Sequence, residues 1–188
     1  DLSVPIHVVP NGMEGEYFAP RGEVAVEEHS LVFTGMMAYV PNHDGIHWFC
    51  DEVLPLIAAK VPNVKLYVVG KNPPESILAL KSAQVEVTGT VPDVRPYVWK
   101  SAVYVVPLRM GGGTRLKVAE ALAMKKPMVS TRIGCEGIDL KDGESCLMAD
   151  APQDFADAVV RLLGDKKLRT VLAENGHRVA KQKYDWNV

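Results

Sequence analysis

The sequence has few cysteines and no long hydrophobic run. Its three cysteines form no CxxC pair, so the pattern predicts neither a zinc site nor a disulfide framework and favours a reducing cytosol. No segment approaches the roughly 18 consecutive apolar residues typical of a membrane helix. The chain also lacks a starting Met and a basic or apolar leader, which suggests an excised domain or a processed chain.

Neither sign of charge is in large excess. The 21 Lys and Arg residues and 23 Asp and Glu residues leave a formal net charge of -2, so nucleic acid is not expected as the main ligand. A local phosphate site is compatible with this balance. The chain has 188 residues, of which 47% are hydrophobic, enough for one packed core. We therefore expect a single domain over residues 1–188.

Short apolar runs alternate with helical segments along the chain, as in α/β proteins with a parallel, doubly wound sheet. We expect a Rossmann-like sheet of about six strands with helices on both faces. Pro55 should kink or break the first long helix. The expected strands are 31–34, 64–69, 85–88, 102–106, 127–130 and 145–148. The expected helices are 44–60, 75–81, 94–99, 114–125, 152–163 and 165–183.

The first 29 residues differ from the rest. They contain a strand-like run at 7–9, a turn signal at Pro-Asn-Gly and a polar approach to the first expected strand. We interpret residues 1–29 as a connector from a preceding domain. At the other end, Tyr184 and Trp186 form an aromatic pair that a lone domain has little reason to expose.

The most informative segment is a run of three glycines between the expected strand 102–106 and the expected helix 114–125. Gly111, Gly112 and Gly113 cost backbone entropy on folding and fill no core. Without Cβ atoms, their backbone N–H groups could close on a phosphate at the start of a helix. The segment therefore predicts an anion-binding loop.

The helix after the glycines begins with polar residues. Thr114 is expected to cap it, and Arg115 and Lys117 would add positive charge beside the phosphate. Positive charge in a first turn opposes the helix dipole, and this misfit favours binding over a solvated surface role. Glu120 has two readings: an ion pair with Lys117, or a carboxylate that accepts from ligand hydroxyls. The spacing does not decide between them.

Glycines also follow the other expected strands, at Gly35, Gly70, Gly89 and Gly134. Because ligands of doubly wound sheets bind beyond the carboxyl ends of the strands, these loops outline one cleft. The glycine spacing matches neither GxxxxGK[ST] nor GxGxxG, which disfavours NTP hydrolysis and hydride transfer. No histidine lies in an HExxH pattern, so no metal is expected.

The segment 111–131, which begins Gly-Gly-Gly-Thr-Arg-Leu-Lys-Val-Ala-Glu-Ala-Leu-Ala, resembles the signature of retaining group 1 (family 4) glycosyltransferases of the GT-B fold. The resemblance extends over nearly the whole chain. It includes, in order, Val-Pro-Asn-Gly at 9–12, Val-Phe-Thr-Gly at 32–35, Leu-Tyr-Val-Val-Gly at 66–70 and Val-Thr-Gly-Thr-Val at 87–91.

Such enzymes have two Rossmann-like domains, of which the C-terminal one binds a nucleoside diphosphate sugar and the N-terminal one binds most of the acceptor. The resemblance implies that this chain is the C-terminal, donor-binding half. It further implies sugar transfer to an acceptor hydroxyl with retention, in cell-envelope or polysaccharide biosynthesis. The fragment alone is then expected to be inactive.

The resemblance also assigns roles to residues of the glycine loop and its helix. Glu120 matches the second glutamate of the family's E-x7-E motif, which binds the donor ribose hydroxyls. Arg115 and Lys117 would meet the diphosphate and stabilise the charge of the leaving group. Gly113 and Thr114 would offer backbone N–H groups. No cofactor besides the donor substrate and no metal is implied.

Two departures accompany these assignments. Gly112 stands where the family has its first glutamate. Its backbone can still contact the nucleotide-sugar donor, but the usual carboxylate contact to the sugar is absent. Gly35 matches the glycine of the first loop, but the three residues after it are uncharged where the family has Arg and Lys. We infer that Arg115 and Lys117 replace some of that charge. Val91 lies where backbone groups meet the base.

Two other functions remain open at this stage. One is half of a nucleotide-sugar epimerase of similar two-domain fold, and the other is a noncatalytic nucleotide or phosphate-binding module. The expected partners are the nucleotide-sugar donor and an N-terminal acceptor-binding domain. The expected location is the cytoplasm, with peripheral association of the full-length protein at the inner face of the membrane.

Overall fold

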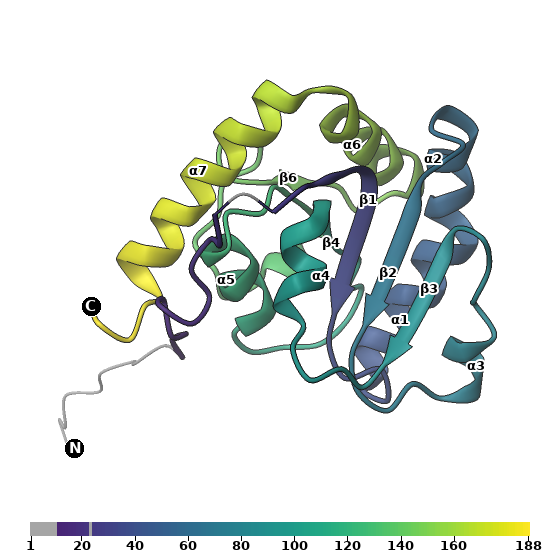
Figure 1. Ribbon diagram of the computed structural model, residues 1–188, viewed down its shortest axis with the longest axis horizontal. Coiled ribbons are helices and arrows are strands. Elements are labelled where there is room, and N and C mark those ends of the chain that lie inside the picture. The colour runs from purple at the N-terminus through teal and green to yellow at the C-terminus, as the bar shows by residue number, and fades with distance from the viewer. Residues whose placement is uncertain (1–10, 23) are drawn as a thin grey trace, which may run out of the picture.

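The centre of the computed structural model, which describes residues 11–22 and 24–188, is a six-stranded parallel sheet (Figure 1). The strand order is β3-β2-β1-β4-β5-β6, so the order reverses between β1 and β4. The predicted Rossmann-like, doubly wound α/β fold of about six strands is confirmed. The strands are β1 (Glu27–Thr34), β2 (Lys65–Val69), β3 (Val85–Gly89), β4 (Ser101–Val106), β5 (Met128–Ser130) and β6 (Leu147–Met148).

Helices cover both faces of the sheet. On one face α6 packs against α2, and on the other α5 packs against α7 (Figure 1). The helices are α1 (Val40–Trp48), α2 (Leu54–Lys60), α3 (Glu75–Leu78), α4 (Arg95–Lys100), α5 (Leu116–Ala123), α6 (Pro152–Gly164) and α7 (Lys166–Lys183), with a π-helix at Phe49–Val53 and a 3-10 turn at Ile133–Cys135.

The expected helix 44–60 begins earlier, at Val40, and contains an irregularity near Pro55. The π-helical turn Phe49–Val53 separates α1 from α2, and the backbone N–H of Leu54 bonds to the carbonyl of Phe49. Proline has no N–H to continue the α-helical ladder, and a π turn just before it accommodates that loss. The predicted kink or break therefore takes the form of a π turn.

The register of the central strands brings their carboxyl ends level. Thr34, the last residue of β1, pairs with Val69, the last residue of β2. All six residues of β4 are buried, as are the last five of β1, which explains their continuous apolar runs. The loops that follow β1 and β2 consequently start side by side, and this sets the position of the candidate site.

Met13, near the start of the described residues, lies beside the segment that follows α7. Met13 is buried and accepts a backbone bond from Trp186, while the Met13 N–H bonds to the carbonyl of Tyr184 at 2.7 Å. Tyr184 is buried, whereas Trp186 is 62% exposed. Residues 27–29 lie in β1, and the strand-like run expected at 7–9 lies outside the described residues. That residues 1–29 lead from a preceding domain stays a prediction.

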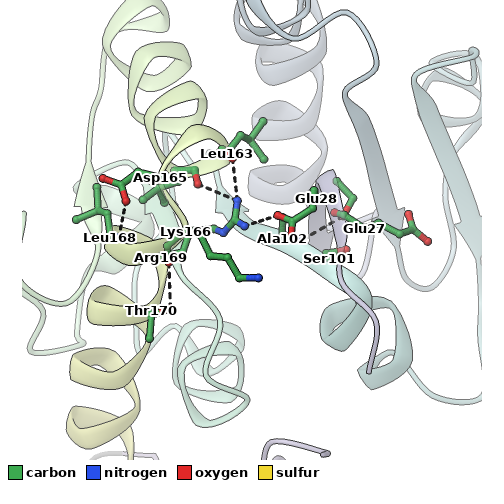
Figure 2. Close-up of polar contacts among 12 residues, drawn as sticks. Glu27, Glu28, Ser101, Ala102, Leu163, Asp165, Lys166, Leu168, Arg169 and Thr170 are labelled. Carbon is green, nitrogen blue, oxygen red and sulfur yellow. Dashed lines mark hydrogen bonds and ion pairs between the residues drawn. The ribbon is translucent and has the colours of Figure 1, made fainter. Parts of the chain in front are cut away.

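At the amino end of the sheet, Arg169 ties α6 and α7 to β1 (Figure 2). Its buried guanidinium donates to the carbonyls of Leu162 and Leu163 at 3.1 and 2.9 Å, near the end of α6, and pairs with Glu28. A hollow of about 430 Å³ lies beside it. Because these donors satisfy carbonyls and a carboxylate of other elements, we assign Arg169 a structural role.

Replacing Arg169 with Met should lower the free energy of unfolding by about 2 kcal/mol, because two carbonyls lose their donor and Glu28 loses its partner. The matched control is Lys166→Met, an exposed position one turn earlier in the same helix, which should change stability by less than about 0.5 kcal/mol. Urea unfolding of both variants checks this. Equal midpoints for the two variants would contradict the structural role.

Candidate functional site

The candidate site lies at the carboxyl ends of β1, β2 and β4. The loops after β1 and β2 are bonded through their backbones: the N–H of Gly35 donates to Val69 at 3.0 Å, and that of Met37 donates to Lys71 at 2.9 Å. A Cβ at Gly70 would overlap the carbonyl oxygen of Gly35. Glycine at position 70 is therefore required for the two loops to pack this closely.

The side chain of Lys117 reaches from the first turn of α5 into the loop after β1. Its Nζ donates to Oδ1 of Asn42 at 2.6 Å and lies 4.2 Å from the centre of the Phe33 ring. A Cβ at Gly35 would come within 2.8 Å of this ammonium. Gly35 thus leaves room for a cation that lies 82 positions away in the sequence, and the fold brings the two residues together.

The environment of Lys117 disfavours its charge. Burial, together with the nearby Arg115 and against the opposing effect of Glu120, lowers the pKa of Lys117 to about 7. A desolvated ammonium gains more from an anion than a hydrated one, because the interaction is less screened. The group is therefore suited to receive negative charge.

Arg115 takes a different direction from Lys117. Its buried guanidinium lies under the glycine loop, where Nη1 donates to the Gly112 carbonyl at 3.0 Å and Nε donates to Ile133 at 3.3 Å. Nη2 is buried without a hydrogen-bond partner in the described part of the chain and lies 3.6 Å from a carboxylate oxygen of Glu136. Arg115 consequently shapes the loop, with one donor group left over.

The expectation that Thr114 caps α5 is wrong. The helix begins at Leu116, Arg115 occupies the cap position, and no side chain accepts a hydrogen bond there. Gly113 has φ of +82°, and the Arg115 guanidinium holds the preceding turn in a loop conformation. Thr114 therefore lies within the loop, packed against Gly137 rather than at the helix start.

The backbone conformation requires glycine at some positions of the loop but not at all of them. Gly113 and Gly111 have positive φ, at +82° and +111°, where a side chain would be strained. Gly112 has an ordinary φ, and a Cβ there would meet no atom within 4 Å. The space beside the exposed backbone of Gly112 is thus open.

Glu120 lies on α5 and is half-buried. Burial raises the pKa of this carboxyl, and Lys117 opposes the increase. Within residues 11–22 and 24–188, its carboxylate forms no hydrogen bond or ion pair, so the pair with Lys117 is not formed at ion-pair distance. Of the two readings of Glu120, the geometry favours an acceptor for ligand hydroxyls.

Val91 follows β3, at the edge of the sheet. It is half-buried and packs against the core, so a ligand could meet its backbone rather than its side chain. In the sheet, β2 separates β3 from β1. The loop that contains Val91 and the start of α5, which carries Lys117, therefore lie at the same edge of the sheet but at different points along it.

Sequence reasoning missed Asn42 and a supporting layer of polar groups. The Tyr104 hydroxyl contacts the Thr34 hydroxyl at 2.6 Å between β4 and β1, and burial raises the pKa of Tyr104. Arg109 pairs with Asp44 through bonds of 2.6 and 3.0 Å, joining the approach to the glycine loop to α1. No local pattern signals these contacts, because each joins residues distant in sequence.

In residues 11–22 and 24–188, no group of three or more His, Cys, Asp or Glu side chains is arranged to hold a metal ion. Over the same residues, no helix has the length and apolar character needed to cross a membrane.

Comparison with known proteins bears on this site. Over 141 residues, the chain is 31% identical to the lipopolysaccharide core biosynthesis glycosyltransferase LpsE of Rhizobium meliloti. This match covers 71% of this chain and 40% of LpsE. The chain spans between 27% and 42% of the length of the curated relatives that it matches.

Solved structures share the fold. The C-terminal domain of the group 1 family protein LpcC from Francisella tularensis has a TM-score of 0.77 at 20% identity, covering 93% of this chain and 100% of that one. Anabaena Alr3699/HepE in complex with UDP and glucose has a TM-score of 0.74 at 12% identity, covering 93% and 52%.

The decisive match is to the family described as glycosyl transferases group 1, and it extends over residues 28–165. It includes the loops after β1, β2, β3 and β4 that form the candidate site. The chain therefore belongs to the group 1 glycosyltransferases.

Proposed function

We propose that this chain binds the nucleoside diphosphate of a sugar donor and forms the donor half of a retaining glycosyltransferase. The observation that carries the proposal is the ammonium of Lys117 beside Gly35, at the edge of the sheet where doubly wound folds bind their ligands. The structure of HepE, a protein of the same fold, contains UDP and glucose.

The diphosphate would lie between the loop after β1 and the glycine loop. Lys117 supplies positive charge, and the backbone N–H groups of Gly112, Gly113 and Thr114 supply uncharged donors. Such groups stabilise the negative charge that develops on a leaving diphosphate during transfer. Arg115, whose Nη2 lies 3.6 Å from Glu136, keeps the glycine loop in place.

The nucleoside would extend along the same edge. The unpaired carboxylate of Glu120 accepts hydrogen bonds from the ribose hydroxyls, and the backbone at Val91 meets the base. Gly112 leaves open the place of a carboxylate near the sugar, so the sugar is held there by backbone groups. The donor is a substrate, and the proposal involves no metal or other cofactor.

The complete enzyme would add an N-terminal domain for the acceptor, to which residues 1–29 lead, and the chain alone would not transfer sugar. The relative LpsE is named for lipopolysaccharide core biosynthesis. A cell-envelope or polysaccharide acceptor at the cytoplasmic face of the membrane fits the proposal.

A panel of UDP, GDP, ADP and their sugars should reveal one preferred nucleoside diphosphate. A ligand at 100 times its Kd stabilises the folded chain by about 2.7 kcal/mol, which thermal unfolding detects. Lys117→Ala should lose this stabilisation, whereas Lys60→Ala, at an exposed lysine on α2, should keep it. Absence of stabilisation by every nucleotide would refute the donor site.

Product analysis with the full-length protein then separates the functions. Transfer of the sugar with retained configuration supports the proposal. An epimerised donor would indicate an epimerase, and nucleotide binding without any product would indicate a binding module.

Glu120→Gln should weaken binding of the preferred nucleoside diphosphate roughly 10- to 100-fold, because a charged acceptor contributes about 1.5–3 kcal/mol. The 2′-deoxy form of the same ligand should show a smaller loss, since one of the hydroxyls is already missing. Isothermal titration calorimetry measures both, with Glu52→Gln as the control at an exposed glutamate. Equal losses for the ribose and deoxyribose ligands would rule out the ribose contact.

A further inference from the structure

Asn42 is a buried polar residue in the first turn of α1, and both ends of its side chain are bonded. Its Nδ2 donates to the carbonyl of Met36 at 2.9 Å, and its Oδ1 accepts from Lys117 Nζ at 2.6 Å. An ammonium only donates and a carbonyl only accepts, so these two partners fix which end of the amide is which. Only 5% of Asn42 is exposed, so the amide itself is shielded from water.

The bridge holds Lys117 at one place. A Cβ at Gly35 would lie 2.7 Å from Nδ2 of Asn42 and 2.8 Å from Nζ of Lys117, so both polar groups occupy the space that glycine leaves free. The loop residues Met36, Met37 and Ala38 carry no charge. Arg109, the cation before the glycine loop, is already paired with Asp44. Among the described residues, Lys117 is the cation whose side chain is bonded into this loop, through Asn42.

An uncharged partner suits this task. An aspartate at position 42 would orient the ammonium equally well but would neutralise it, and the pair would attract a diphosphate less strongly. The carboxamide of Asn42 accepts the hydrogen bond without adding negative charge. Asn42 can therefore orient the lysine without neutralising its charge.

We propose that Asn42 is a positioning residue of the donor site, which holds the ammonium of Lys117 beside Gly35 to meet the donor diphosphate. This inference rests on the proposed function, because it assigns the ammonium a diphosphate partner.

The groups around Lys117 determine how the site responds to pH. Arg115 and Glu120 act on it from α5 with opposite signs, while α1 contributes the neutral Asn42 and β1 the ring of Phe33. From β4, Tyr104 faces Glu120 and stays neutral because burial raises its pKa. Because the pKa of Lys117 is about 7, its side chain is uncharged in a growing fraction of the nucleotide-free protein as the pH rises above 7. A bound diphosphate favours the ammonium, so binding takes up a proton and weakens with rising pH.

The test measures the Kd for UDP, or for the diphosphate that the panel prefers, by calorimetry at pH 7 and pH 9. The wild-type chain should bind at least about tenfold more weakly at pH 9, since Lys117 loses its proton over this range. Asn42→Ala should raise Kd at pH 7 about tenfold, because the ammonium is no longer oriented. Asn42→Asp should also bind weakly at pH 7 but lose the pH dependence, since its carboxylate keeps Lys117 charged.

Asn63→Ala and Asn63→Asp provide matched controls, because they make the same chemical changes at an exposed position. Both should retain the Kd and pH profile of the wild-type chain. Circular dichroism checks the fold of each variant. NMR titration of the Lys117 ammonium without nucleotide adds a separate measurement: its pKa should rise in Asn42→Asp and stay unchanged in Asn63→Asp.

The outcomes separate two failures. A wild-type chain that binds none of the nucleoside diphosphates overturns the proposed function. Nucleotide binding that depends on Lys117, combined with an unchanged Kd in Asn42→Ala or an unchanged pH profile in Asn42→Asp, overturns the role of Asn42 alone. An unchanged Lys117 pKa in Asn42→Asp overturns it as well, even if neither Asn42 variant binds nucleotide.

Discussion

The hydrogen bond from the half-buried Lys117 on α5 to Asn42 on α1 is the interaction on which the candidate site depends. The ammonium of Lys117 lies beside Gly35, over the ring of Phe33 and 2.6 Å from Asn42. Taking an ammonium out of water is costly, so the group needs a fixed acceptor and gains from a bound anion. The glycine at position 35 and the amide at position 42 are the two features that make this placement feasible.

The two ends of the sheet serve different purposes. At the carboxyl end, the loops after β1 and β2 pack backbone to backbone and leave polar groups with unused bonding capacity, notably Glu120 and the Nη2 of Arg115. At the amino end, Arg169 bonds to carbonyls of α6 and pairs with Glu28. Both ends contain cations with bonded side chains: Arg169 joins three elements at the amino end, whereas Lys117 lies beside Gly35 at the edge where doubly wound folds bind their ligands.

Membership of the group 1 glycosyltransferases gives this asymmetry a chemical context. A diphosphate donor needs charge at the phosphates and acceptors at the ribose, and the site offers a cation and a separate carboxylate three residues apart on α5. The chain departs from the family pattern at Gly112 and in the uncharged loop after Gly35. In the proposed site, Lys117 on α5 would supply the charge that the loop after Gly35 lacks.

The sequence by itself determined the order and type of the main elements, because apolar periodicity and glycine positions are local properties of the chain. It also predicted which loops share one edge of the sheet, since parallel strands present their carboxyl ends at the same edge. Its helix limits were less accurate at residues 40 and 116, where loop contacts rather than capping residues set the start. Only the tertiary structure decided that Arg115 turns under the glycine loop while Lys117 reaches Gly35. Those directions depend on partners such as Ile133 and Asn42, which become neighbours only after the sheet has formed.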